Sequence, residues 1–504
     1  MAYMYFTVLG LIPGVMKLRP RELDLLKIIT EENHRKWWIL TIVCVAGFMS
    51  VWDYAAMTVI LPSIKQDLSF TDTGLVWVVN ASLVTFAGFL LLGGGLSDMF
   101  GHQRMFPWGV LTFSIASMAC ALSTSSWVLL VARAVQGLGG AIISTSSLSL
   151  ILSLFESTHE RSKAMGINVF AASSGAVIGI VVSGILTSVL TWRWVFATNC
   201  FLGWAIYIAF KQVLSPEPKG IRHRSLDLAG ATAITISVTL LIYVVTSIGQ
   251  SGGVSVHVVL LFLCAVAVFF GFIIIERNAA APLVSPQVIR IRTLVICSTA
   301  NALCTASAAA SILLSFYLQQ ILDYSPLWVG FSFLPYCIIT AALALGVSSR
   351  LVIRFGTKRP LVFGLLAVAV GTGSFCRAPL SGNAFAEILP GLVIFGIGTG
   401  IAYNPLTVAA MEGVPRDQAG IASGILGTAS VFGRAVGLAT LVTVAALRTH
   451  MALSYGDDYR RALSSGYHLA FLVAGGCALA AAIIIAGLLP GEELGARRRH
   501  EVPI

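Results

Sequence analysis

Charged side chains are scarce in this sequence. Only 11% of its 504 residues are Asp, Glu, Lys or Arg, whereas 57% are hydrophobic. Soluble globular domains carry about 25% charged residues, because they keep charge in water and rarely bury it unpaired. The composition therefore excludes an ordinary soluble protein. The apolar residues instead run in blocks of roughly 20, which is the length needed to cross a bilayer.

Several chemical signatures are also missing. The nine cysteines are scattered through apolar stretches without a CxxC pair or a matching histidine cluster, which argues against a disulfide framework or a zinc site. The phosphate-binding pattern Gly-x-x-x-x-Gly-Lys-Ser/Thr does not occur, so ATP-driven transport is not indicated. Nor do His, Asp and Glu cluster as a membrane-embedded enzyme would require. We therefore expect no catalytic residues, no metal and no cofactor.

The apolar blocks predict an all-α polytopic membrane protein with fourteen spanning helices. Their spacing leaves no room for a soluble domain between the first and the last span. The predicted spans cover residues 37–63, 74–95, 105–123, 127–153, 164–190, 194–212, 226–249, 255–276, 293–322, 327–348, 359–377, 385–410, 419–447 and 467–489.

The positions of the basic residues predict the orientation of these helices, because cytoplasmic loops retain Lys and Arg. With both termini in the cytoplasm, most of the 32 basic residues fall in inner loops and tails. Arg133 and Arg434 fall inside spans. The outer segments carry only Lys65, Arg193, Arg377, Arg448, Arg460 and Arg461. A multi-pass protein of the cell membrane thus explains the net charge of +10 without a nucleic-acid partner.

An internal repeat divides the chain. The segment 100–106 (FGHQRMF) and the segment 355–361 (FGTKRPL) match at an offset of 255 residues, and each is followed three residues later by a glycine. Parallel repeats are typical of transporters whose substrate site lies between two halves. We therefore expect a cytoplasmic extension (1–36), a six-helix bundle (37–212), two inserted helices (226–276), a second six-helix bundle (293–489) and a cytoplasmic tail (490–504).

A second, weaker match supports the repeat. Gly137-Leu138-Gly139 corresponds to Gly396-Ile397-Gly398 at an offset of 259 residues. Either match alone could arise by chance, whereas the two together favour duplicated halves.

The loop after the second span, GGLSDMFGHQR at residues 94–104, resembles the loop signature of the major facilitator superfamily. An acid and a base at this spacing can pair across two helix ends and form a latch. An ordinary basic cytoplasmic turn is the simpler alternative. Three positions that are usually basic in the family are not basic here, so the latch would depend on one arginine. The candidate latch residues are Gly94, Asp98, Gly101 and Arg104.

Arg133 lies inside the span 127–153. An arginine within a membrane costs about 3 kcal/mol and normally faces a partner or a water-filled cavity. Its side chain could instead extend to the nearby outer surface. Because Gln136, Gly137 and Gly139 follow at the spacing of the family's fourth-helix motif, the resemblance favours a functional role.

Asp53 is the only acid that lies well inside a predicted span. Together with Leu61-Pro62, it resembles the first-helix motif of the drug:proton antiporters. At a rise of about 1.5 Å per residue, Asp53 and Arg133 lie at similar depth. An apolar cavity favours the protonated form of a carboxyl group, whereas a nearby arginine favours the ionised form. We hypothesise that Asp53 is the main proton carrier and that Arg133 tunes it.

Two further features are less specific. Gly175, Gly179 and Gly184 resemble the antiporter motif of the fifth helix, although the usual proline is absent, and glycines four residues apart also serve close helix packing alone. Arg434 could pair with Asp53 or attract an anionic substrate, and its side chain could equally extend to the membrane surface.

Over nearly its whole length the chain resembles the fourteen-helix drug:proton antiporter family of that superfamily. The resemblance implies export of amphipathic or cationic organic compounds by alternating access, with the proton gradient as the energy source. It also implies that the spans 37–63, 127–153, 293–322 and 385–410 line the cavity. We expect a monomer whose partners are the lipid bilayer, protons and a small organic substrate. The alternatives are an exporter of a lipid or an anionic metabolite, and an uncoupled sensor.

Overall fold

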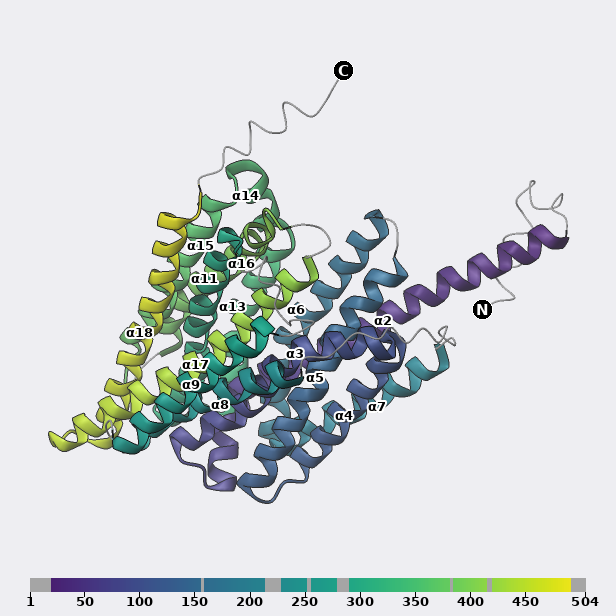
Figure 1. Ribbon diagram of the computed structural model, residues 1–504. Coiled ribbons are helices and arrows are strands. Elements are labelled where there is room, and N and C mark those ends of the chain that lie inside the picture. The colour runs from purple at the N-terminus through teal and green to yellow at the C-terminus, as the bar shows by residue number, and fades with distance from the viewer. Residues whose placement is uncertain are drawn as a thin grey trace.

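The computed structural model describes residues 20–155, 158–213, 228–251, 255–278, 290–380, 384–414 and 419–490. Every regular element in these ranges is helical. Figure 1 shows two helix bundles side by side, the first coloured purple to blue and the second green to yellow. We call the side on which α2 begins and α18 ends the terminal face, and the other side the opposite face.

The first bundle consists of six helices. Polar caps mark two starts at the opposite face, where the side chains of Thr71 and Ser125 accept hydrogen bonds from backbone N–H groups of the next turn. The first predicted span is only part of a longer helix, which begins within the predicted extension; residues 1–19 lie outside the described residues. The helices are α2 (Pro20–Leu68), α3 (Asp72–Phe100), α4 (His102–Ala121), α5 (Ser126–Leu154), α6 (Thr158–Val189) and α7 (Arg193–Val213).

The second bundle differs from the predicted spans in two places. The span 293–322 is divided at Ala309 into two helices, and the span 327–348 contains a π-helical turn before its last helix. The elements are α11 (Arg292–Ala308), α12 (Ala310–Gln320), α13 (Pro326–Ala342), η2 (Leu343–Val347), α14 (Ser348–Phe355), α15 (Lys358–Ser374), η3 (Phe375–Arg377), α16 (Ala384–Met411), α17 (Ala419–Ser454) and α18 (Tyr459–Leu488).

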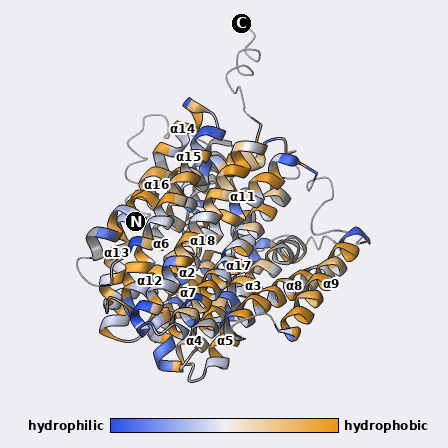
Figure 2. Cartoon of the chain, turned by 90° about the vertical axis from the view of Figure 1, so that its left-hand side faces the viewer, coloured by the Kyte–Doolittle hydropathy of each residue, from blue (hydrophilic) through white to orange (hydrophobic). Residues whose placement is uncertain are grey.

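The inserted pair, α8 (Leu228–Ser251) and α9 (Val256–Asn278), packs against both bundles. Helix α8 contacts α3 of the first bundle and α17 of the second. The Thr443 hydroxyl donates a hydrogen bond to the Val245 carbonyl at 2.9 Å, which ties α17 to α8. Figure 2 shows α8 and α9 along one edge of the molecule, where their mainly apolar surface suits a lipid environment.

By length and composition, ten helices in the described ranges are long and apolar enough to cross a membrane. Shorter apolar stretches lie at Gly74–Leu90, Thr232–Val245 and Pro326–Ala342. The chain is therefore a multi-pass, all-helical membrane protein.

Hydrogen bonds between the two bundles lie in the half of the molecule toward the opposite face. Across α12 and α2, the Gln319 amide donates to the Val59 carbonyl at 3.0 Å. Across α13 and α6, the Leu327 N–H donates to the Ser188 hydroxyl at 3.0 Å. The helices α3 and α17 meet through the Asn80 amide, which donates to a backbone carbonyl at 3.1 Å.

Candidate functional site

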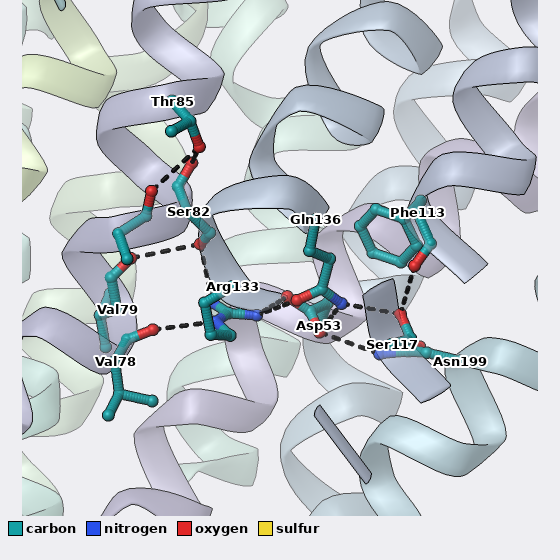
Figure 3. Close-up of polar contacts among 11 residues, drawn as sticks. Asp53, Val78, Val79, Ser82, Thr85, Phe113, Ser117, Arg133, Gln136 and Asn199 are labelled. Atoms are coloured by element: carbon teal, nitrogen blue, oxygen red, sulfur yellow. Dashed lines mark hydrogen bonds and ion pairs between the residues drawn. The ribbon is translucent and has the colours of Figure 1, made fainter. Parts of the chain in front are cut away.

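Asp53 of α2 and Arg133 of α5 form a buried ion pair inside the first bundle (Figure 3). The Arg133 Nη1 and the Asp53 Oδ2 are 2.6 Å apart. Arg133 is completely buried, and Asp53 retains only 5% of its accessible surface. The similar depth predicted from the sequence thus corresponds to direct contact between the two side chains.

The guanidinium group of Arg133 has partners on several helices. Its Nε donates to the Val78 carbonyl of α3 at 2.8 Å, and its Nη2 donates to the Ser82 hydroxyl at 2.8 Å. The same group lies over the Phe196 ring of α7, with Cζ 5.7 Å from the ring centroid. Arg133 therefore points into the bundle and does not extend to the surface.

The second carboxylate oxygen of Asp53 accepts hydrogen bonds from two amides. The Gln136 Nε2 donates to Oδ1 at 2.9 Å, and the Asn199 Nδ2 donates to the same atom at 3.0 Å. The Gln136 amide also donates to Ser117 at 2.9 Å, and its carbonyl oxygen accepts from Arg133. The carboxylate thus has three donors, which connect α2 to α5 and α7.

Asn199 and Ser117 were absent from the sequence-based candidates. Asn199 is 1% exposed and Ser117 is fully buried. An amide inside the largely apolar span 194–212 is a signal that could have drawn attention to Asn199, because buried polar side chains generally have partners. Ser117 carries no comparable signal, since serines are frequent throughout the apolar spans.

The ion pair and the two amides hold α2 against its neighbours. A buried ion pair is costly to break, because the remaining charge loses its partner in a medium of low dielectric constant. Addition of a proton to Asp53 would remove the negative charge that Arg133 and both amides contact. The link between α2 and its neighbours would then weaken.

A cavity of about 430 Å³ adjoins the ion pair and extends toward the terminal face. Its walls come from α2, α3, α4, α5 and α6, together with two residues of α17. The expected contributions of 37–63 and 127–153 are present, whereas no described residue of 293–322 or 385–410 lines this cavity. The lining includes Ser50, Asp53, Tyr54, Ser82, Phe86, Phe113, Arg133, Gln136, Ser144, Ser147, Asn168, Val431 and Arg434.

Arg434 of α17 lies at this cavity and does not pair with Asp53 in this structure. Its Cζ is 4.9 Å from the centroid of the Tyr54 ring, and its Nη2 donates to Ser430 at 3.2 Å. Both contacts leave its positive charge uncompensated.

The candidate latch is described only in part. Gly94 and Asp98 belong to α3, but the side chain of Asp98 lies outside the described residues, so its pairing is untested. Gly101 separates α3 from α4 with φ of 91°, a conformation that glycine adopts at little cost. Arg104 is exposed in the first turn of α4.

The motif glycines lie at close helix contacts. A Cβ added at Gly137 would meet the Ser82 carbonyl oxygen at 2.2 Å, and one at Gly139 would meet the Phe113 nitrogen at 2.6 Å. In α6, Gly175 and Gly179 face the α2 backbone, and Gly184 faces the Pro326 carbonyl across the bundle boundary. These glycines have a packing role, whatever further role they serve.

Within the described ranges, no group of three or more His, Cys, Asp or Glu side chains could hold a metal ion.

Comparison with known proteins supplies the family context. The model of the Major Facilitator Superfamily matches residues 43–438. The chain is 31% identical to the puromycin resistance protein pur8 of Streptomyces alboniger, with 81% of this chain and 82% of that protein covered. It is also 31% identical to the cephamycin export protein CmcT of Amycolatopsis lactamdurans, with 83% and 88% covered.

Further matches concern another relative and the fold. The multidrug resistance protein Stp of Mycobacterium tuberculosis is 30% identical, with 82% of this chain and 78% of that protein covered. Among solved structures, the peptide transporter POT in complex with sulfate has a TM-score of 0.64 at 17% identity, with 90% of this chain and 96% of that chain covered. This last match concerns the fold alone.

Proposed function

This chain belongs to the major facilitator superfamily and is a membrane transporter rather than an enzyme, and from that premise we propose that it exports amphipathic organic compounds in exchange for protons. The observation that carries the proposal is the Asp53–Arg133 ion pair, buried in the first bundle and adjoining the cavity. Ionisable residues at this depth are energetically costly and rare, and where they occur they usually mark a functional site.

In this proposal, protonation of Asp53 changes the relative stability of two arrangements of the bundles. When Asp53 is ionised, its three donors join α2 to α5 and α7; when it is protonated, these contacts weaken. A ligand shifts a conformational equilibrium only by its differential affinity for the two states. Protonation that favours one arrangement and substrate that favours the other would therefore drive alternating access.

The orientation follows from the charge distribution. Because the loops at the terminal face are rich in Lys and Arg, we place this face and both termini in the cytoplasm of a cell whose plasma membrane holds the protein. The bundles contact each other toward the opposite face, and the cavity extends toward the terminal face. The structure then corresponds to the inward-facing state, ready to accept a cytoplasmic compound.

The remaining architecture is proposed on the same basis. Ten long apolar helices, three shorter ones and α4 together make fourteen spans. Residues 37–212 and 293–489 form the two moving bundles, with residues 226–276 inserted between them. We propose a monomer that needs no cofactor, because the proton gradient supplies the energy.

The substrate class is inferred from the cavity and from the relatives. A cavity of about 430 Å³ with aromatic and hydroxyl groups suits a drug-sized amphipathic molecule. The relatives are named for export of, or resistance to, puromycin, cephamycin and lincomycin. Cationic compounds are the first expectation from the family resemblance, whereas the position of Arg434 favours a second candidate, an anionic metabolite or lipid.

Reconstitution in proteoliposomes with an imposed pH gradient tests the function. We expect a panel of dyes, lipids and metabolites to include a class that causes proton movement in the wild type, and Asp53→Asn to lose this movement. The matched control is Asp67→Asn, because Asp67 lies on the same helix and pairs with an arginine in an exposed position. Full proton-driven transport by Asp53→Asn would contradict the proposal, and absence of coupling with every class would favour an uncoupled sensor.

A further inference from the structure

The charges that line the cavity do not balance. Among the described lining residues only Asp53, Arg133 and Arg434 are charged. Asp53 and Arg133 neutralise each other within the first bundle. Arg434 is therefore the residue that gives this part of the cavity a formal charge of +1.

The contacts of Arg434 leave hydrogen-bonding capacity unused. The Tyr54 ring and the Ser430 hydroxyl are neutral partners, one through its π face and the other through a single hydrogen bond at 3.2 Å. The Nε of Arg434 is buried and has no hydrogen-bond partner among the described residues. A buried donor without an acceptor is destabilising, so the protein itself does not satisfy this guanidinium group.

Ser147, which also lines the cavity, likewise has an unsatisfied polar atom, its hydroxyl oxygen. It is buried and has no hydrogen-bond partner within the described part of the chain. Two lining residues therefore have a polar atom that no described partner satisfies, and one of these residues carries a positive charge. The chemistry that satisfies an arginine best is an oxyanion, because the planar guanidinium group can donate two parallel hydrogen bonds to it.

The only carboxylate among the described lining residues is already engaged. Asp53 accepts from Arg133, Gln136 and Asn199. A cationic substrate that sought this carboxylate would have to displace a charged donor and two amides. The described lining therefore offers a cation no free anionic partner, whereas it offers an anion a free guanidinium group.

On the premise of the proposed transport function, we propose that the cavity binds amphipathic organic anions and that Arg434 contacts their carboxylate, phosphate or sulfonate group. The apolar body packs against Tyr54, Phe86 and Phe113, which line the same cavity. Arg434 belongs to the second bundle and the proton-carrying pair to the first. The anionic group would thus contact the second bundle and the apolar body the first, so that substrate and proton influence each other through the position of one bundle relative to the other.

The test compares two probes that share a xanthene skeleton and differ in charge. Anionic fluorescein and cationic rhodamine 123 are titrated with the full-length protein in nanodiscs of phosphatidylcholine, and binding is followed by fluorescence anisotropy. We expect the wild type to bind fluorescein at least about tenfold more tightly. We expect Arg434→Gln to weaken fluorescein binding by about 10- to 100-fold, as loss of a charged hydrogen bond predicts.

Two further variants define the role of the charge. Arg434→Lys retains the charge without the planar group and is expected to lose only part of the affinity. Arg354→Gln is the matched control, because Arg354 also stacks on an aromatic ring, that of Phe355, but lies exposed on α14 outside the cavity. This control should bind both probes as the wild type does.

The anion can come from solution or from the bilayer, and the disc composition distinguishes these sources. Replacement of part of the phosphatidylcholine by phosphatidylglycerol lowers the apparent affinity for fluorescein in the wild type, but not in Arg434→Gln, if an anionic lipid enters the cavity. Unchanged affinity assigns the site to soluble anions. Both results support an anion site.

Equal affinity of the wild type for the two probes would overturn the proposal, and this comparison requires no variant to fold. Equal weakening of both probes by Arg434→Gln would also overturn it, since that result indicates a change in cavity shape. No pH gradient is present, so failure here leaves proton coupling intact, and failure of coupling in Asp53→Asn vesicles leaves the anion site intact.

Discussion

The two bundles share a scaffold but not a charged network. In the first bundle, Gly139 of α5 allows contact with α4, where an added Cβ would lie 2.6 Å from the Phe113 nitrogen. In the second, Gly398 of α16 allows the same contact with α15, at 2.5 Å from the Val368 nitrogen. The turns before α4 and α15 also correspond, with φ of 91° at Gly101 and 78° at Gly356.

The difference appears one and two turns earlier on the same helices. Counted back from these glycines, Arg133 corresponds to Leu392 and Gln136 to Phe395. Leu392 and Phe395 are both 1% exposed, and the Phe395 ring stacks on Tyr336 with a centroid distance of 4.7 Å. Both bundles thus have glycines at the close helix contacts, whereas only the first bundle has an ionisable residue one or two turns before them.

The largest effect is expected where the charged network is broken. Arg133→Met leaves the Asp53 carboxylate buried without its cation, so we expect a loss of about 3–5 kcal/mol in unfolding free energy and loss of proton-driven transport. Thermal unfolding in detergent and proteoliposome transport measure the two effects.

The double variant Asp53→Leu/Arg133→Met is the control for this substitution. It makes the first bundle resemble the apolar second bundle and should recover most of the stability but no transport. Equal stability of wild type and Arg133→Met would show that the pair contributes nothing to folding.

The shared scaffold is tested by Gly139→Ala and Gly398→Ala. Each added Cβ meets backbone at less than 3.0 Å, which must shift the neighbouring helix, so each variant should lose about 1–3 kcal/mol. The midpoint of thermal unfolding is the measurement. Gly166→Ala is the control, because nothing lies within 4 Å of its added Cβ. Markedly unequal losses at the two sites would break the structural equivalence of the bundles.

A pair of buried asparagines separates stability from coupling. Asn199 donates to Asp53 at 3.0 Å, whereas Asn301 of the second bundle donates to the Leu426 carbonyl at 3.1 Å. Replacement of either by alanine should cost about 1–2 kcal/mol, because each removes one buried hydrogen bond. Only Asn199→Ala should also change the pH dependence of transport. A similar change in Asn301→Ala would argue that the amide acts through general packing.

The smallest effect is expected at an ion pair near the surface that both bundles repeat. Arg193, at the start of α7, pairs with Asp67 near the end of α2, and Arg460, near the start of α18, pairs with Asp323 just after α12. Solvent screening limits such pairs to about 0–1 kcal/mol. Arg460→Gln should therefore shift thermal unfolding slightly, and Arg193→Gln somewhat more, because Arg193 is less exposed and also donates to the Ser123 carbonyl at 3.0 Å. A loss above about 2 kcal/mol in Arg460→Gln would contradict the first expectation.

The sequence was most informative where one residue type carries a large energetic cost. Asp53 and Arg133 could be identified because ionisable groups are rare inside a membrane span, and helix geometry gave their common depth. Asn199 was missed because a single amide carries a weaker signal. Of the expected cavity helices, 37–63 and 127–153 line the cavity, whereas no described residue of 293–322 or 385–410 does. Arg434 lines it because of the way α17 packs, which no local pattern encodes.

The sequence by itself determined an all-helical, duplicated membrane protein with one deep acid. Length, hydropathy and glycine spacing are local properties, and the bilayer allows few ways to satisfy them. Only the tertiary structure decided the partners of the polar side chains. Arg133 pairs with Asp53, two amides donate to the second oxygen of that carboxylate, and Arg434 stacks on an aromatic ring. These contacts join residues 80 or more positions apart. Such contacts form only when particular faces of two helices pack together, and the sequence of one helix alone does not specify this packing.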